Sequence, residues 1–398
     1  MIGLASQPSK FLGFVRFSCT EILCRSFCLS RFALCCKHMN LSELRAFSIA
    51  RSLWSEPDLK TAISRFGFVQ ADPIRAPARA QDLILMQRVK NYKAGDLERQ
   101  YTTLGVEEDF FVNYGFVTRE IQSLMHPRSF DSTLKIEHEA PGLTNRVLEF
   151  VRQNGATHPK ELEREFGKQR VGNYWGGGSQ ATTRALDGLH YRGHLRVARR
   201  DNGIKVYEAA PHLEAMLEKP LSNTDMAKGL IDLIVRIYAP LSEQTLGQLV
   251  SLSGYGAPHL KLEIRAALKT AKAELESVKL DGLRYFWNPI DSLETNIKPT
   301  VRLLAPFDPV VWDRRRFEHL HGWEYKFEAY TPPAKRIRGY YALPLLWQDK
   351  IIGWGNLKVV NGILESEIGF VGAKPKSKTF NTALETELMR MREFLGVN

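Results

Sequence analysis

The chain has 398 residues, 44% of them apolar and 25% charged, the usual balance for a globular protein with two or three domains. This composition excludes a largely disordered, collagen-like or coiled-coil protein. Lysine and arginine number 55 against 44 for aspartate and glutamate, a formal charge of +11. The excess favours a polyanionic partner, either nucleic acid or an anionic surface.

The first 38 residues differ from the rest of the chain. All five cysteines fall there, which excludes a disulfide framework, a thiolate zinc site and a cysteine nucleophile elsewhere. Basic residues interrupt its apolar runs, which argues against a membrane span. We interpret residues 1–38 as a non-structural leader or an over-called start, with Met39 opening the protein. The alternative is an organelle transit peptide, because the segment is basic, serine-rich and poor in acids.

Residues 39–135 are expected to form a winged-helix-like module. Apolar periodicity and turn residues predict two helices, a short extended segment, and further helices to about residue 128. The extended segment is favoured because a proline disfavours helix at the residue before it. The first three elements are expected over 40–53, 57–66 and 68–73.

Residues 140–215 show the element order of a winged helix, which is three short helices followed by a hairpin. The turn sequence Asp201-Asn202-Gly203 is a strong hairpin signal between two alternating segments. The helices are predicted over 145–153, 161–166 and 180–191, and the strands over 195–198 and 204–207. Ser179 is expected to cap the third helix.

The same order is expected again over 220–298, and residues 299–398 are expected to form a β-rich C-terminal domain. The helices are predicted over 226–238, 242–252, 260–277 and 381–394, the hairpin over 278–287, and two C-terminal strands over 338–343 and 350–354. The predicted fold class is therefore α+β, mainly α, with tandem winged-helix modules.

The predicted hairpin of the second module carries a concentration of basic residues. Alternation along the first strand places Leu195 and Val197 on one face and Arg196 on the other, so that a basic edge can contact phosphates. The alternative is a solvated surface hairpin. The residues predicted to bind DNA here are Arg192, Arg196, Arg199, Arg200 and Lys205.

Two further patterns carry weaker signals. The glycine-rich run from Gly172 to Ser179 lacks the lysine of a nucleotide-binding loop, but its backbone N–H groups and Ser179 could contact a DNA phosphate. The alternative is a flexible turn. The run Glu318-His319-Leu320-His321 has no further ligands at metal-binding spacing, so we expect neither a metal nor a cofactor.

Gln70-Ala71-Asp72 is the sharpest candidate for chemistry. Residues two apart in an extended segment project from the same face, so Gln70 and Asp72 would point together. A carboxylate beside a carboxamide suits hydrolysis, because one can stabilise a cation or accept a proton while the other orients water. The spacing alone favours a structural polar pair, which is commonplace where the chain leaves a helix.

Several motifs along the body of the chain resemble the winged-helix DNA glycosylase family of the YcaQ/AlkZ type, which repairs interstrand crosslinks. The segment from Gly67 to Ile74 is similar to the catalytic Gln-apolar-Asp motif of this family. The other matching stretches are Ala78-Arg79, Leu189-His190-Tyr191-Arg192-Gly193, Val197-Ala198-Arg199-Arg200, Pro306-Phe307-Asp308-Pro309, Trp312-Asp313-Arg314, Pro333-Ala334-Lys335-Arg336 and Gly339-Tyr340-Tyr341.

The resemblance implies a tandem winged-helix scaffold that encloses DNA and excises N7-alkylated purines, with crosslink unhooking in some members. It implies catalytic roles for Asp72 as electrostatic stabiliser and base and for Gln70 in positioning water, and it adds Arg79 to the DNA-binding residues. We accordingly expect a monofunctional glycosylase that acts as a monomer on damaged double-stranded DNA, away from membranes. A bacterial member would work in the cytoplasm at the nucleoid, and one with a transit peptide in an organelle. The alternative is a non-catalytic winged-helix DNA-binding protein or transcriptional regulator.

The chain departs from the family pattern in two places. Where many members have a Trp-Ala-His-Glu-like stretch, this sequence has Val112-Asn113-Tyr114-Gly115. A Gly-Arg-x-Asp-x-Lys pattern near the end appears as Gly353-Trp354-Gly355-Asn356-Leu357-Lys358. The missing His–Glu pair bears on substrate range and on activity itself.

Overall fold

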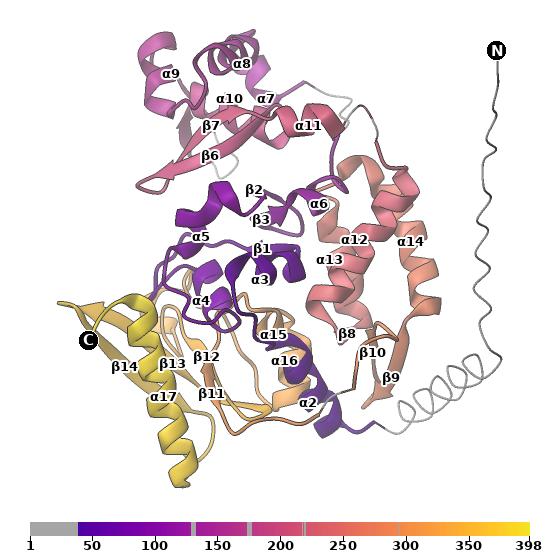
Figure 1. Cartoon of the computed structure of the whole chain (residues 1–398), viewed down its shortest axis with the longest axis vertical. Helices are drawn as coiled ribbons and strands as arrows, with labels where there is room; N and C mark the ends of the chain where they lie inside the picture. The colour runs from indigo at the N-terminus through magenta and orange to yellow at the C-terminus, as the bar shows by residue number, and fades with distance from the viewer. Residues whose placement is uncertain (1–38, 129–132, 173–176, 217, 219, 294) are drawn as a thin grey trace, which may run out of the picture. The chain divides into compact units, whose positions relative to one another are not determined.

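The computed structural model describes residues 39–128, 133–172, 177–216, 218, 220–293 and 295–398. The chain divides into two units, Met1–Asn40 and Leu41–Asn398, and the elements below belong to the second (Figure 1). The expectation for residues 1–38 lies outside the described residues.

The first part of this unit combines short helices with a three-stranded antiparallel sheet of order β1-β3-β2. Its elements are α2 (Leu41–Ser52), α3 (Leu59–Phe66), β1 (Phe68–Gln70), α4 (Ala80–Met86), α5 (Asp96–Gln100), the 3-10 turn η1 (Tyr101–Thr103), β2 (Val106–Phe110), β3 (Tyr114–Thr118) and α6 (Arg119–Gln122). The helical pattern expected up to residue 128 is thus wrong over β2 and β3. The acidic run Glu107-Glu108-Asp109 in β2 is buried in polar contacts, which hides the apolar alternation of a strand.

The second part has the predicted order of three helices and a hairpin. Its elements are α7 (Lys135–Glu139), α8 (Leu143–Asn154), α9 (Pro159–Phe166), β4 (Arg170–Gly172), β5 (Gly178–Gln180), α10 (Ala181–Tyr191), β6 (Leu195–Asp201), β7 (Ile204–Ala209) and α11 (Pro211–Met216). Asn202 and Gly203 both have positive φ, as the predicted tight turn requires. The expected cap at Ser179 is wrong, because Ser179 lies in β5 and Gln180 occupies the N-cap position.

The third part repeats this order of helices and hairpin. Its elements are α12 (Asn223–Tyr238), β8 (Leu241–Ser242), α13 (Glu243–Ser253), the 3-10 turn η2 (Pro258–Leu260), α14 (Lys261–Glu274), β9 (Glu276–Leu280) and β10 (Leu283–Trp287). Ser242 caps α13 through the backbone N–H of Thr245, and the hairpin pairs with β8 in the order β8-β10-β9.

The last part is built on a four-stranded antiparallel sheet of order β11-β12-β13-β14, with α17 packed against β11. Its elements are β11 (Val301–Leu303), α15 (Pro309–Trp312), α16 (Arg314–His321), η3 (Pro333–Lys335), β12 (Leu343–Trp347), β13 (Lys350–Val360), β14 (Ile363–Phe370) and α17 (Lys378–Leu395). This confirms an α+β fold with a β-rich C-terminal region.

The strand expected over 338–343 is wrong for most of its length, since β12 begins only at Leu343. The buried carboxylate of Glu328 accepts hydrogen bonds from the backbone N–H groups of Ile337, Arg338 and Gly339. Because these donors are satisfied by a side chain, they are not free for a sheet ladder.

An apolar core joins the first part to the last, since side chains of α4 such as Leu83 and of α17 such as Phe380 belong to one buried cluster. A buried ion pair adds to it. Arg88 donates to both carboxylate oxygens of Asp308 at 2.6 and 2.9 Å, and both side chains are fully buried. These contacts hold residues 68–88 against residues 303–312, where the candidate site lies.

Candidate active site

Gln70 and Asp72 lie where β1 ends. Gln70 is the last residue of the strand and pairs with Gly115 of β3. Asp72 follows in an extended segment, where its Oδ1 accepts the backbone N–H of Ile74 at 2.9 Å and its own N–H donates to Oε1 of Gln81 at 3.3 Å. The strand and the start of α4 therefore fix both predicted residues.

The carboxamide of Gln70 is oriented by a residue from the far end of the chain. The indole Nε1 of Trp312 donates to Gln70 Oε1 at 3.1 Å, and Gln70 is 7% exposed. Within the described residues the Nε2 group has no hydrogen-bond partner. The bond to Trp312 thus leaves the amide N–H donors of Gln70 free to orient a water molecule or a substrate oxygen.

Trp312 is itself held by the C-terminal motifs. It ends the one-turn helix α15, which Asp308 caps through the backbone N–H of Val310, and Asp308 is the partner of Arg88. Its ring lies 5.4 Å from that of Tyr238, centroid to centroid. The motifs that contain Asp308 and Trp312 therefore fix the position of the Gln70 carboxamide.

Asp72 is half-buried and makes no ion pair with any residue that the structure describes. Burial raises the pKa of its carboxyl, and the hydrogen bond from Ile74 offsets only part of this. The nearby Tyr341 is buried, and its hydroxyl has no hydrogen-bond partner among the described residues. Burial, together with the charge of Asp72, raises the pKa of Tyr341. Among the described residues the site therefore places a carboxyl without a cationic partner near a hydroxyl without a hydrogen-bond partner.

The first departure from the family pattern lies directly beside this site. Tyr114 O accepts the backbone N–H of Ala71 at 3.0 Å, and Gly115 faces Gln70 across the ladder. A Cβ atom at Gly115 would lie 2.4 Å from the carbonyl oxygen of Val69. This strand pairing therefore fits glycine, and a larger residue there would displace β1 and Gln70.

The second departure lies in β13, where Asn356 donates its side-chain N–H to the carbonyl of Arg338 at 2.7 Å. This bond holds the segment that leads into Tyr341. Asn356 therefore helps to fix the position of Tyr341 near Asp72.

Residues 63–394 match the family described as AlkZ-like DNA glycosylases. The chain belongs to the AlkZ-like DNA glycosylase family. The solved structure of the DNA glycosylase AlkZ from Streptomyces sahachiroi has a similar fold, with a TM-score of 0.57 and 15% identity over 90% of this chain and 97% of that one.

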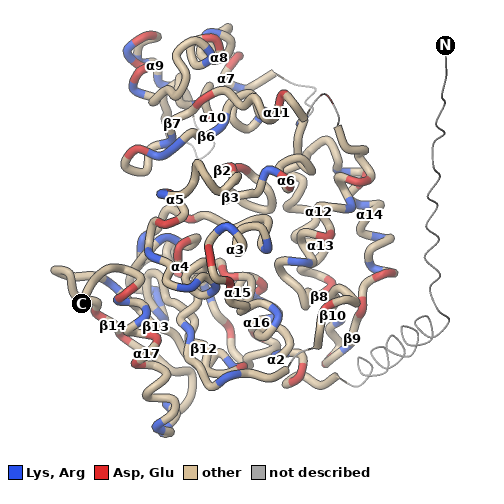
Figure 2. Tube along the Cα trace, in the orientation of Figure 1, with Lys and Arg blue, Asp and Glu red and all other residues tan. Residues whose placement is uncertain are grey.

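The basic hairpin of this AlkZ-like chain does not present all its arginines to solvent. Arg196 pairs with Glu107 at 2.8 Å and also with Glu208, and Arg200 pairs with Glu108 at 2.5 Å. Figure 2 shows acidic positions on β2 close to basic positions of β6 and β7. Two of the predicted phosphate contacts are therefore engaged by carboxylates of the first part, and the hairpin docks on β2 through them.

Sequence reasoning missed these carboxylates and the buried cluster beside them. Asp109 contacts Arg128 at 2.8 Å and His126 at 2.9 Å. Burial alone would raise the pKa of Asp109, but Arg128 and His126 hold it well below its usual range. Arg128 also donates to the carbonyls of Tyr191 and Gly256, so one guanidinium joins three parts of the chain. The run of three consecutive acidic residues in a basic protein is the sequence signal that could have indicated this buried cluster.

The remaining predicted DNA-binding residues lie at several places. Arg199 is exposed and, among the described residues, forms an ion pair only with Asp201 of its own hairpin, whereas Arg79 pairs with Glu98. Ser179 and Lys205 line a cleft of about 700 Å³ against α10 together with Tyr191 and Tyr255. Arg192 is the C-cap of α10. Their contact with DNA stays a prediction.

Within the described residues no group of three or more histidine, cysteine or acidic side chains could hold a metal. His319 contacts Asp281 and Tyr285, while His321 accepts the backbone N–H of Ile351. The described residues also include no helix that is apolar and long enough to cross a membrane.

Proposed function

We propose that this chain is a monofunctional DNA glycosylase that hydrolyses the N-glycosidic bond of N7-alkylated purines in duplex DNA. The observation that carries the proposal is the half-buried carboxylate of Asp72, which has no cationic partner among the described residues and follows the oriented carboxamide of Gln70. A structural carboxylate in such a position is normally paired, because burying an unpaired charge costs free energy.

The chemistry follows from the charge of the substrate. An N7-alkylated purine already carries a positive charge, so cleavage of the bond between C1′ and N9 releases a neutral base without protonation. The electron pair of the bond leaves with the base, and the sugar develops oxocarbenium character. Asp72 stabilises this cation through its charge and then accepts a proton from water as the water oxygen attacks C1′. Gln70 orients this water through its amide N–H.

The same cleavage at one purine of an interstrand crosslink would separate the two strands. Partial burial of Asp72 also serves this chemistry, since a carboxylate partly shielded from water stabilises a nearby cation more strongly than a fully hydrated one.

The competing function is a DNA-binding protein or transcriptional regulator that retains the scaffold without the chemistry. The missing His–Glu pair at Val112–Gly115 favours it, and the undamaged Gln70–Asp72 arrangement opposes it.

The experiment that separates the two is incubation of the full chain with a duplex carrying one N7-methylguanine, followed by alkaline cleavage at abasic sites. The proposal expects strand breaks at that position only, and release of free 7-methylguanine. A chain that binds the duplex but leaves it intact would support the regulator.

A further inference from the structure

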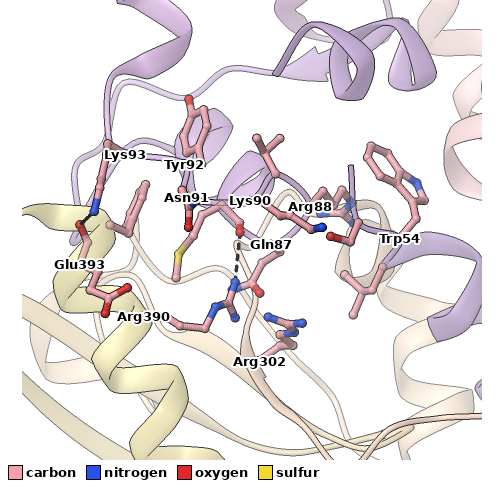
Figure 3. A pocket seen from close by; sticks show the side chains of 15 residues that line it. Trp54, Gln87, Arg88, Lys90, Asn91, Tyr92, Lys93, Arg302, Arg390 and Glu393 are labelled. Atoms are coloured by element: carbon pink, nitrogen blue, oxygen red, sulfur yellow. Dashed lines mark hydrogen bonds between the residues drawn. The ribbon is translucent and has the colours of Figure 1, made fainter. Parts of the chain in front are cut away.

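A cavity of about 420 Å³ lies at the opposite end of α4 from Asp72. Figure 3 shows the side chains that line it. Gln81, in the first turn of α4, contacts Asp72, whereas Gln87, just after its last turn, lines the cavity. The walls are the turn over residues 86–93, the chain after α2, β11 and the end of α17. The cavity is therefore separate from the candidate active site.

The lining of this cavity is strongly basic. It contains five basic side chains and one acidic side chain, which is Glu393. The basic residues are Arg88, Lys90, Lys93, Arg302 and Arg390. Two of the five form ion pairs with carboxylates that do not line the cavity: Arg88 pairs with Asp308, and Arg390 pairs with Glu387.

Arg302 is the cation without an adequate partner. Its nearest carboxylate is Glu387 at 4.0 Å, which is too long for a hydrogen bond. Glu387 already accepts hydrogen bonds from Gln87 at 2.8 Å, from the backbone N–H of Leu303 at 2.9 Å and from Arg390 at 2.5 Å. Arg302 makes no hydrogen bond with any described residue, although only 26% of its side chain is exposed.

The mouth of the cavity adds further positive charge. Lys90 is exposed and forms no ion pair within the described part of the chain, and Lys93 donates only to the backbone carbonyl of Glu393 at 2.7 Å. A largely buried arginine with free N–H donors, in the same lining as two lysines, offers the charge and donors that suit a phosphate group.

We propose that this cavity binds a phosphate group, with Arg302 as its principal ligand and Lys90 as a charge at the mouth. The cavity is larger than a phosphate and falls within the size range of pockets for small organic ligands. The phosphate can come from the backbone of a DNA duplex or from a free mononucleotide. The proposal does not depend on the proposed glycosylase activity.

The test is the melting temperature of the full chain in inorganic phosphate, compared with sodium chloride at the same ionic strength. The wild-type Tm rises by on the order of 5 °C when phosphate is present at about 100 times its Kd. Arg302→Met keeps the length of the side chain but removes the donors, so the phosphate-dependent rise disappears. Without phosphate its Tm equals or exceeds that of the wild type, because an under-paired buried cation is lost.

Two further variants keep the result specific. Arg302 also borders a neighbouring cavity of about 610 Å³, which Lys90 does not line, so Lys90→Ala must weaken phosphate binding if the first cavity is the site. Arg315→Met removes an exposed charge from α16, outside the cavity, and must leave the rise unchanged. The absence of a rise in the wild type, or an equal rise in Arg302→Met, overturns the proposal.

The source of the phosphate is read from two additional titrations. If DNA occupies the cavity, Arg302→Met binds an undamaged duplex more weakly than the wild type, and phosphate competes with the duplex. If a free nucleotide occupies it, duplex affinity is the same in both proteins, and a nucleoside monophosphate binds the wild type more tightly than inorganic phosphate does.

Discussion

The indole N–H of Trp312 donates a hydrogen bond of 3.1 Å to the carboxamide of Gln70, although 242 residues separate them along the chain. Trp312 stands at the end of α15, whose first residues are tied to Arg88 through Asp308. This relationship links the C-terminal motifs to the Gln70–Asp72 motif and leads to the first prediction.

Trp312→Phe should lower the rate of excision by about 5-fold, since the loss of one hydrogen bond worth about 1 kcal/mol frees the carboxamide to rotate. Gln70→Ala should show a partial loss as well. In the double variant the two losses should not multiply, because Trp312 acts through Gln70. Single-turnover excision and KM measure this. Fully multiplicative losses, or a loss in KM alone, would show that Trp312 contributes by another route.

The pH profile of excision should reflect the raised pKa of Asp72. Burial favours the protonated form of Asp72. As the pH falls, excision should therefore decline at a higher pH than it would for an aspartate with the ordinary pKa of 3.8. The substrate does not contribute to this acidic limb, since an N7-methylated guanine keeps its positive charge as the pH falls. Single-turnover rates between pH 4 and 8 measure the limb. The limb is assigned to Asp72 if it disappears in Asp72→Asn and stays unchanged in the control variant Gln70→Ala.

The hairpin arginines that face β2 should matter for stability. Arg200→Gln leaves the carboxylate of Glu108 buried without its partner and should lower the free energy of unfolding by about 2–4 kcal/mol. The double variant Glu108→Gln/Arg200→Gln removes both charges and should recover most of this loss. Chemical denaturation of the four proteins gives the coupling energy. Equal losses in the single and double variants would mean that the pair does not hold the hairpin.

Arg199 should instead contribute to DNA binding, because it is exposed and its partner Asp201 is exposed on the same hairpin. Arg199→Gln should weaken binding to any duplex and reduce the slope of log Kd against log salt by about 0.9, the loss of one phosphate contact. Fluorescence anisotropy at several salt concentrations measures this. An unchanged slope would place Arg199 outside the interface.

The helices and hairpins with strong local signals were predictable from the sequence. The turn at Asn202-Gly203, the helix expected over 242–252 and the extended segment that holds Gln70 all depend on neighbouring residues, and the structure places these elements close to the predicted residues. Each of these elements forms from residues that are close together in the sequence.

Features that depend on distant partners were not predictable in the same way. Glu107 and Glu108 lie in a strand because arginines of another part neutralise them, so β2 lacks the usual apolar alternation. Glu328 removes three backbone donors from the expected strand near residue 338. Trp312 could be recognised as part of a motif, but its contact with Gln70 follows only from the packing of the C-terminal part on the first.

The most direct test of the central claim is the single-turnover rate at which Asp72→Asn excises N7-methylguanine from a duplex. The substitution keeps the size of the side chain and removes its charge, so the rate should fall by on the order of 10²–10⁴. Duplex affinity should be unchanged, and the Tm at neutral pH should be equal or higher, because the raised pKa of Asp72 means that its ionised form destabilises the fold above that pKa. Excision at the wild-type rate by a normally folded Asp72→Asn variant would contradict the account.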